Sequence, residues 1–209
     1  MEKQQSAEEI AQQRIRVMGP DLGAVYHALC NEVTWLHAKW LQYRKLFGHS
    51  ESRVDLLNQT AAFFFRVVQD VVFEDVLLHI ARLTDPPRQG EYENLSLLRL
   101  PRVEHDQSIA ADLSRLIATA KSKSVFSREW RNRRIAHRDY ALALDAKSQP
   151  LPGVSRQEVE DVLAAFRNVL NHLESHHFAG HIAFECFLSY DDADALVECL
   201  ERSTHATLE

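Results

Sequence analysis

The stretch from residue 128 to residue 139 reads REWRNRRIAHRD, and eight of its twelve side chains can ionise. Arginine guanidinium groups bind phosphate and carboxylate anions in a defined geometry, because they present several N–H donors in one plane. Histidine can accept or donate a proton near neutral pH. The one histidine of this stretch, His137, lies among five arginines. The stretch therefore contains the residue types that could hold an anion and move a proton beside it.

The distribution of charge sets this stretch apart from the rest of the chain. The whole sequence has a net charge of −6, whereas residues 121–138 contain seven Lys or Arg and one acidic residue, Glu129. An acidic protein with one concentrated basic segment favours a focused anion site over general binding to polyanions. On charge alone, a basic helix face turned towards solvent is an equal alternative.

The spacing of apolar residues argues against that alternative. Phe126 and Trp130 form a helical stripe facing a core, and further steps of three or four reach Arg133 or Arg134 and then His137. Burying Arg or His without a partner is strongly unfavourable, so such positions require a counter-ion, a ligand or a cleft. The pattern favours a site over a solvated face.

Length and composition limit the class of protein. A chain of 209 residues that is 45% apolar can bury one core, and only six Gly and six Pro favour helices over strands and turns. No segment approaches the length of a membrane span, and the N-terminus lacks the apolar core of a signal peptide. We therefore expect a soluble, cytoplasmic protein. Cys30, Cys186 and Cys199 lie far apart, which predicts neither disulfide bonds nor a cysteine zinc site.

Helical periodicity covers most of the sequence and predicts an all-α fold, a single helical bundle over residues 1–209. Its base is a pair of long helices, one at about 21–47 and the next ending near residue 83. Because few residues join them, we expect an antiparallel hairpin. Residues 1–19 form a polar N-terminal extension that contains a short helix, and residues 181–209 form a C-terminal appendage.

The remaining elements follow from breaks and capping signals. Prolines interrupt the pattern over residues 84–103, where we expect one helical turn at Asn94–Leu98. Later helices are predicted around 109–120, over the basic stretch at 125–140, from the capping box at 155–158, and after Asp191, with an extended or irregular segment at 181–190. The aromatic residues on helical stripes are expected in the core: Trp35, Trp40, Phe63, Phe64 and Phe65.

A histidine cluster in NHLESHHFAGH is a rival candidate site. His172 and His176, and likewise His177 and His181, are four residues apart, a spacing that can place two metal ligands on one helix face. The two pairs point roughly 140° apart on a helix, and Gly180 is expected to end that helix before His181. We therefore predict no metal site and interpret these residues as surface histidines.

The pattern R-N-x4-H-x-D, from Arg131 to Asp139, resembles the motif of the HEPN superfamily of small helical proteins. The wider layout is similar to the AbiU2-like HEPN group. That group has two long N-terminal helices, the segment ARLTDP at Ala81–Pro86 and a NLSL stretch at Asn94–Leu97. The resemblance extends from about Leu22 to Leu200.

This resemblance implies a metal-independent endoribonuclease without a cofactor, acting as a toxin or in abortive infection against phage. RNA would be the substrate, and the partners would be a second copy of the chain and an antitoxin or a nucleotidyltransferase. It also implies three groups of site residues. The catalytic residues would be Arg131, Asn132 and His137, and the phosphate contacts would be Arg133, Arg134 and Arg138. The supporting acids would be Asp139 and Asp85. The alternatives are an inert HEPN domain that binds RNA, nucleotide or protein, and a purely structural helical protein.

The spacing of the motif favours a homodimer. On a regular helix Arg131 and His137 would point roughly 120° apart and stand about 9 Å apart along the axis. One chain could aim both at a single phosphate only if the helix bent. Two copies related by a two-fold axis could bring Arg131 of one chain towards His137 of the other. We therefore expect the helices at 125–140 to lie close to that axis.

Overall fold

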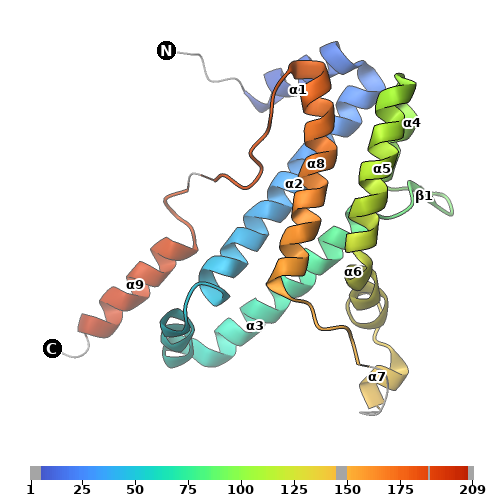
Figure 1. The fold of residues 1–209 in the computed structure, drawn as a ribbon. Coiled ribbons are helices and arrows are strands. Elements are labelled where there is room, and N and C mark those ends of the chain that lie inside the picture. The colour runs from blue at the N-terminus through green and yellow to red at the C-terminus, as the bar shows by residue number, and fades with distance from the viewer. Residues whose placement is uncertain (1–5, 145–149, 188, 207–209) are drawn as a thin grey trace, which may run out of the picture.

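The computed structural model describes residues 6–144, 150–187 and 189–206, and these residues form an all-α bundle, as predicted. Helices dominate the chain in Figure 1, and the only strands of the described part are two strands of two residues each, which pair as a hairpin. The elements in chain order are α1 Ala7–Met18, α2 Pro20–Phe47, α3 Glu51–Leu83, β1 Arg88–Gln89, β2 Tyr92–Glu93, η1 Leu97–Arg99, α4 Leu100–Val103, α5 Gln107–Lys123, α6 Val125–Trp130, η2 Arg131–Ile135, α7 Tyr140–Leu144, α8 Arg156–Phe178 and α9 Ala193–Ala206.

The N-terminal extension folds back as a helix against α2. Ser6 and Glu9 form the expected capping box, and α1 ends at Gly19, whose φ of 86° is readily adopted only by glycine. Gly23 allows the close approach of the two helices, because a Cβ atom there would lie 2.6 Å from the Arg14 carbonyl oxygen. Helix α1 is therefore part of the packed structure.

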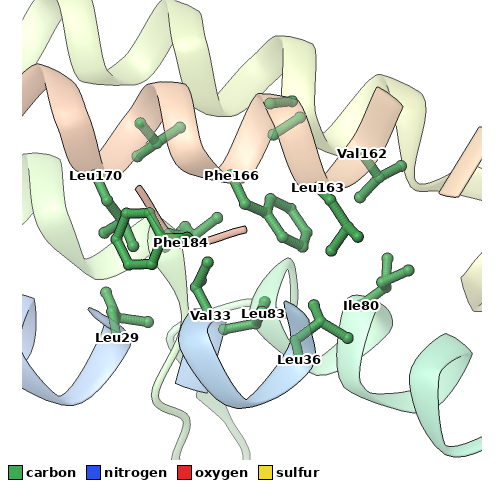
Figure 2. Packing of buried hydrophobic residues seen from close by; sticks show 14 of the residues in the cluster. Leu29, Val33, Leu36, Ile80, Leu83, Val162, Leu163, Phe166, Leu170 and Phe184 are labelled. Atoms are coloured by element: carbon green, nitrogen blue, oxygen red, sulfur yellow. The ribbon is translucent and has the colours of Figure 1, made fainter. Parts of the chain in front are cut away.

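The core lies between the α2–α3 hairpin and α8. Figure 2 shows Leu29, Val33 and Leu36 of α2 facing Leu163, Phe166 and their neighbours on α8, while Ile80 and Leu83 of α3 close the layer. Phe166 is fully buried, so truncation to Ala would cost roughly 3–5 kcal/mol. Helix α5 packs on the other side of α8, which places the chain that follows α5 beside the end of α3.

Helix α3 bends at Ala61, where φ and ψ are −160° and 69°. The Thr60 hydroxyl donates a hydrogen bond to the Leu56 carbonyl oxygen at 2.8 Å, a contact that often bends helices.

The prediction that all five stripe aromatics are buried is wrong for three of them. Trp40 and Phe65 lie in the core, whereas Trp35, Phe63 and Phe64 are exposed.

The segment after α8 returns to the core before α9 begins. Its described residues are irregular, as predicted, and Phe184 inserts between the helices. The Asn171 side chain donates to the Ile182 carbonyl oxygen and accepts from its amide, at 3.0 and 2.7 Å. Lys45 then contacts Asp192 and Asp194 at 2.5 and 2.6 Å, which joins the start of α9 to α2.

No helix among the described residues combines the length and apolarity needed to cross a membrane.

Candidate functional site

The basic stretch begins on a short helix that is fixed to α3. Phe126 of α6 is buried, and the Trp130 ring meets the Phe73 ring edge-on with centroids 5.6 Å apart. Trp130 Nε1 donates to the Pro152 carbonyl oxygen at 3.0 Å. Arg128 donates to the carbonyl oxygen of Thr84, the residue that ends α3, at 2.6 Å. These contacts position the residues that follow Trp130.

The predicted continuous helix over 125–140 is wrong, because the chain changes geometry inside the motif. Residues Arg131–Ile135 form a π-helical turn, and the Asp139 amide donates to the Arg133 carbonyl oxygen at 2.9 Å. A bend at 136–139 then separates this turn from α7. Single π turns inside helices are frequent at functional sites. Arg131 and His137 therefore do not share one regular helix. The separation of roughly 120° that a regular helix would impose no longer argues against a site within one chain.

Arg131 is held by an ion pair with Asp85. Its Nη1 atom lies 2.5 and 2.7 Å from the two carboxylate oxygens of Asp85, and its Nε donates to Asn132 Oδ1 at 3.1 Å. The side chains of Arg131 and Asp85 are 23% and 14% exposed. Asp85 comes from the turn after α3, so two segments distant in sequence fix the guanidinium before any ligand arrives.

Arg134 also has a partner within the chain. Its Nε donates to Glu74 Oε1 of α3 at 2.6 Å, and its guanidinium lies 5.8 Å from the centroid of the Trp130 ring. Its side chain remains 48% exposed. A phosphate that approached Arg134 would therefore share this guanidinium with Glu74.

The other motif residues lie within the π turn or just after it. His137 and Arg138 are exposed in the bend, and Asn132 is exposed beside Arg131. Asp139 caps α7, because its Oδ1 accepts a hydrogen bond from the Leu142 amide at 2.7 Å. The structure thus brings Asp85 and Asn132 together around Arg131. The described contact of the Asp139 carboxylate is instead with a backbone amide.

A pocket of about 230 Å³ adjoins this set and involves residues that the sequence did not single out. Asp85 lines it together with Glu32, His79 and Arg82. His79 is 3% exposed, and burial, followed by the charge of Lys39, lowers its pKa. Its Nε2 lies 2.9 Å from Glu32 Oε2. His79, Arg82 and Asp85 are spaced three residues apart, which places side chains on one face of a helix. This spacing could have predicted the part of the pocket that α3 and the turn after it contribute.

The rival histidine cluster is divided among different partners. His176 Nδ1 lies 2.8 Å from the His172 carbonyl oxygen, and His177 Nε2 lies 3.3 Å from Glu104. Helix α8 ends at Phe178, so His181 lies on the segment beyond it. In the described parts of the chain, no group of three or more His, Cys, Asp or Glu residues is arranged to hold a metal ion.

One of three comparisons with known proteins found a match. A family model for HEPN_AbiU2, described as AbiU2, matches residues 19–196. This range contains the α2–α3 hairpin, Asp85 and the whole basic stretch. Searches of curated proteins and of solved structures gave no match. Because the matched range includes most of the chain, the protein belongs to the HEPN_AbiU2 family.

Proposed function

We propose that this HEPN_AbiU2 protein is a metal-independent endoribonuclease with a toxin or abortive-infection role. The observation that carries the proposal is that one short segment contains a fixed cation and an exposed group that can transfer a proton. Arg131 is oriented by Asp85, and His137 lies accessible six residues later in the bend after the π turn. Catalysis of RNA cleavage needs both functions, since a phosphate must be held while a proton moves next to it.

The chemistry is transfer of the phosphodiester to the neighbouring 2′-oxygen. The 2′-hydroxyl attacks phosphorus, its proton passes to a base, and the bond from phosphorus to the 5′-oxygen breaks as that oxygen takes up a proton. The products are a 2′,3′-cyclic phosphate and a 5′-hydroxyl end. We assign the proton transfer to His137 and stabilisation of the charge on the non-bridging oxygens to Arg131.

Asp85 and Asn132 would position Arg131 for this step. The carboxylate of Asp85 contacts one terminal nitrogen, and Asn132 contacts Nε, which restrains the rotation of the guanidinium plane. Arg133, Arg134 and Arg138 would contact neighbouring phosphates. Arg134 would do so while paired with Glu74, which lowers the local net charge without removing its N–H donors.

We also propose that the working form is a homodimer in which the motifs of the two chains lie near one two-fold axis. An extended RNA strand needs more contact surface than one short bend provides. A second basic stretch would double the positive charge available to the strand. The pairing of two motifs would also place a second His137 where it could protonate the leaving oxygen.

The test is incubation of the purified protein with total RNA in excess EDTA, followed by analysis of the RNA ends. We expect cleavage with cyclic phosphate or 3′-phosphate ends and 5′-hydroxyl ends. Strict dependence on added Mg²⁺ would contradict the proposed chemistry. Salt-dependent binding of RNA without any cleavage would instead support the alternative of an inert RNA-binding HEPN domain.

A further inference from the structure

The pocket beside Asp85 lies where two segments that are separate in the sequence meet. One wall comes from the segment ARLTDP, at the end of α3 and the turn after it, and includes Arg82, Leu83 and Asp85. Another wall comes from Asn94 and Leu95, at the start of NLSL. The proposed chemistry uses only Asp85 of these residues, so the rest of the pocket has no role in it.

The wall at Asn94 is held in place by hydrogen bonds. The Asn94 side-chain amide donates to the Pro86 carbonyl oxygen at 2.8 Å, and its backbone amide donates to the Pro87 carbonyl oxygen at 2.9 Å. Arg99 Nη2 donates to the same Pro87 oxygen at 3.0 Å. The pocket is therefore formed before a ligand binds, which lowers the conformational cost of binding.

The size and lining of the pocket suit one flat ring system. Its volume of about 230 Å³ is below the roughly 300–1,000 Å³ of sites for drug-sized ligands. Leu83 and Leu95 supply apolar surface, and the rest of the lining is polar. A nucleobase matches this combination, because its faces stack on apolar groups and its edges form hydrogen bonds.

The lining offers more hydrogen-bond acceptors than donors. Glu32, Asp85 and Glu93 contribute carboxylates. Arg82 contributes the one guanidinium of the described lining, and the amide donor of Asn94 is already engaged with the backbone. Guanine is the RNA base that presents two adjacent N–H groups, at N1 and N2, with the O6 acceptor beside them. Adenine, cytosine and uracil each present one such group, so the lining favours guanine.

Glu32 of α2 and Arg82 are complementary to that edge of guanine. Arg82 Nη2 lies 3.8 Å from Glu32 Oε2, and the two side chains are 58% and 37% exposed, respectively. Glu32 Oε1 has no hydrogen-bond or ion-pair partner among the described residues. A carboxylate can accept N1–H and N2–H in parallel while an adjacent guanidinium donates to O6. Any other RNA base would leave one carboxylate oxygen without a donor.

His79 also indicates a ligand in this pocket. It lines the pocket and is 3% exposed, and neither ring nitrogen has a hydrogen-bond partner in the described part of the chain. Its Nε2 lies 2.9 Å from Glu32 Oε2, but without the geometry of a hydrogen bond. Buried polar groups are rarely left unpaired, because they have lost their bonds to water. A rotation of Glu32 that accompanies base binding would complete this bond.

The carboxylates of the pocket do not give it a net negative charge. Arg131 contacts Asp85, and Arg99 contacts Glu93 at 3.0 Å. Arg82 balances the remaining carboxylate within the pocket. Three acidic groups are thus matched by three arginines, and the pocket does not repel an RNA strand.

Asp85 places the pocket beside the proposed phosphate contact. Its carboxylate lines the pocket and also contacts Arg131 Nη1. Arg131 Nε donates to Asn132, which leaves Nη2 without a partner among the residues that the structure describes. A strand with one base in the pocket would therefore bring a neighbouring phosphate to Arg131.

We propose that the pocket beside Asp85 binds a guanine base of an RNA strand, with Glu32 accepting N1–H and N2–H and Arg82 donating to O6. This inference rests on the proposed ribonuclease and gives it a sequence preference, cleavage at a phosphate next to guanosine. Glu32 and Arg82 determine specificity and take no part in proton transfer. A strand is favoured over free GMP, because only a strand also reaches the exposed Arg138.

The first test measures binding to His137→Ala protein, which separates recognition from cleavage. The probes are short oligouridines with a central guanosine, adenosine, cytidine or uridine. We expect the guanosine strand to bind at least about tenfold more tightly than the others. Inosine lacks the N2 amine and should lose most of this preference. In contrast, 7-deazaguanosine keeps N1–H, N2–H and O6 and should bind as guanosine does.

The second test changes the pocket. Glu32→Gln replaces a carboxylate oxygen with an amide donor, so affinity for the guanosine strand should fall about tenfold, to that of the adenosine strand. Affinity for the other strands should not change. Glu51→Gln, at the exposed opposite end of α3, is the matched control and should keep the full preference. Melting is recorded for each protein, and the inosine and 7-deazaguanosine strands give an answer even if Glu32→Gln fails to fold.

Equal affinities for all strands, or equal binding of inosine and guanosine, would overturn this inference. A preference for another base would do the same. Tighter binding of GMP than of the guanosine strand would assign the pocket to a free nucleotide and overturn its role in RNA recognition. A guanosine preference in a protein that leaves RNA intact would contradict only the ribonuclease proposal. Cleavage of RNA without any preference for guanosine would contradict only the guanine pocket.

Discussion

At the scale of single residues, the site depends on how one arginine is held. The Arg131–Asp85 pair joins the motif to the turn after α3, and both side chains are largely shielded from water. An ion pair in this position orients the guanidinium more than it stabilises the fold, because desolvation offsets much of the attraction between the two charges. In the proposed ribonuclease, Asp85 would therefore be a positioning residue whose loss should affect turnover before it affects folding.

Asp85→Asn keeps the shape of the side chain but removes its charge. We expect the cleavage rate to fall about tenfold, equivalent to roughly 1.4 kcal/mol of transition-state stabilisation, with only a small loss of melting temperature. Asp75→Asn is a matched control, since Asp75 of α3 also forms an ion pair, with Lys39, outside the motif. Equal rates for Asp85→Asn and wild type would show that the pair does not position Arg131.

His37 provides a prediction for stability. Burial, followed by the charge of Arg167, lowers its pKa to about 4, compared with roughly 6.5 in an unfolded chain. The unfolded state therefore takes up the proton first as pH falls. The contribution of this histidine is fully present above pH 6.5 and is lost progressively as the pH falls towards 4.

Chemical denaturation should show this loss directly. Between pH 7 and pH 4.5 the neutral state of His37 should account for about 2–3 kcal/mol of the decrease in unfolding free energy. His37→Gln should remove that part of the pH dependence, whereas His181→Gln, at an exposed position, should retain it. A pH profile of His37→Gln that overlays the wild type would refute this assignment.

At the scale of elements, the break between α6 and α7 determines where the motif residues lie. The π turn at Arg131–Ile135 and the bend after it take His137 off the helix that carries Arg131. Asp139 ends this bend by capping α7. The conformation of the bend therefore depends on a capping hydrogen bond. Loss of that bond should change the backbone conformation at His137.

Replacing Asp139 separates a capping role from a chemical one. Asp139→Ala should speed amide hydrogen exchange across α7 and lower activity modestly, with a local cost of about 1 kcal/mol. Asp139→Ser and Asp139→Asn can still accept the Leu142 amide and should restore both properties. Loss of activity in all three variants would indicate that the carboxylate itself acts on His137.

The elements also show what the sequence could and could not predict. Helical periodicity was enough for the all-α bundle and for the long hairpin, and the capping boxes at Ser6 and Ser155 gave two helix starts, because these depend on local spacing. It failed at Phe63 and Phe64, since the spacing of an apolar stripe does not show whether the rest of the chain covers it. The π turn had no local signal, and the pairing of Glu32 with His79 depends on how α2 and α3 pack.

At the scale of the whole molecule, an acidic protein carries one strongly basic segment, residues 121–138. The net charge of −6 repels nucleic acid in general, so the proposed RNA binding would rely on the basic stretch. Log affinity should fall with log salt concentration by about 0.7 per phosphate contact with single-stranded RNA.

This slope can be measured without turnover by using His137→Ala protein. Adding Arg138→Ala should reduce the slope by about one contact, because Arg138 is exposed in the bend. Arg202→Ala, on α9, should leave it unchanged. A slope near zero, or one altered equally by both substitutions, would show that RNA does not bind at the basic stretch.

The central claim is that His137 transfers the proton during RNA cleavage, and a single-turnover rate tests it most directly. The rate should be measured in EDTA for wild type, His137→Ala and the control His181→Ala, with helical content and melting recorded for each. We predict that His137→Ala lowers the rate by at least about a hundredfold, whereas His181→Ala leaves it unchanged and all three proteins melt alike. A His137→Ala protein that cleaves RNA at the wild-type rate would contradict the account.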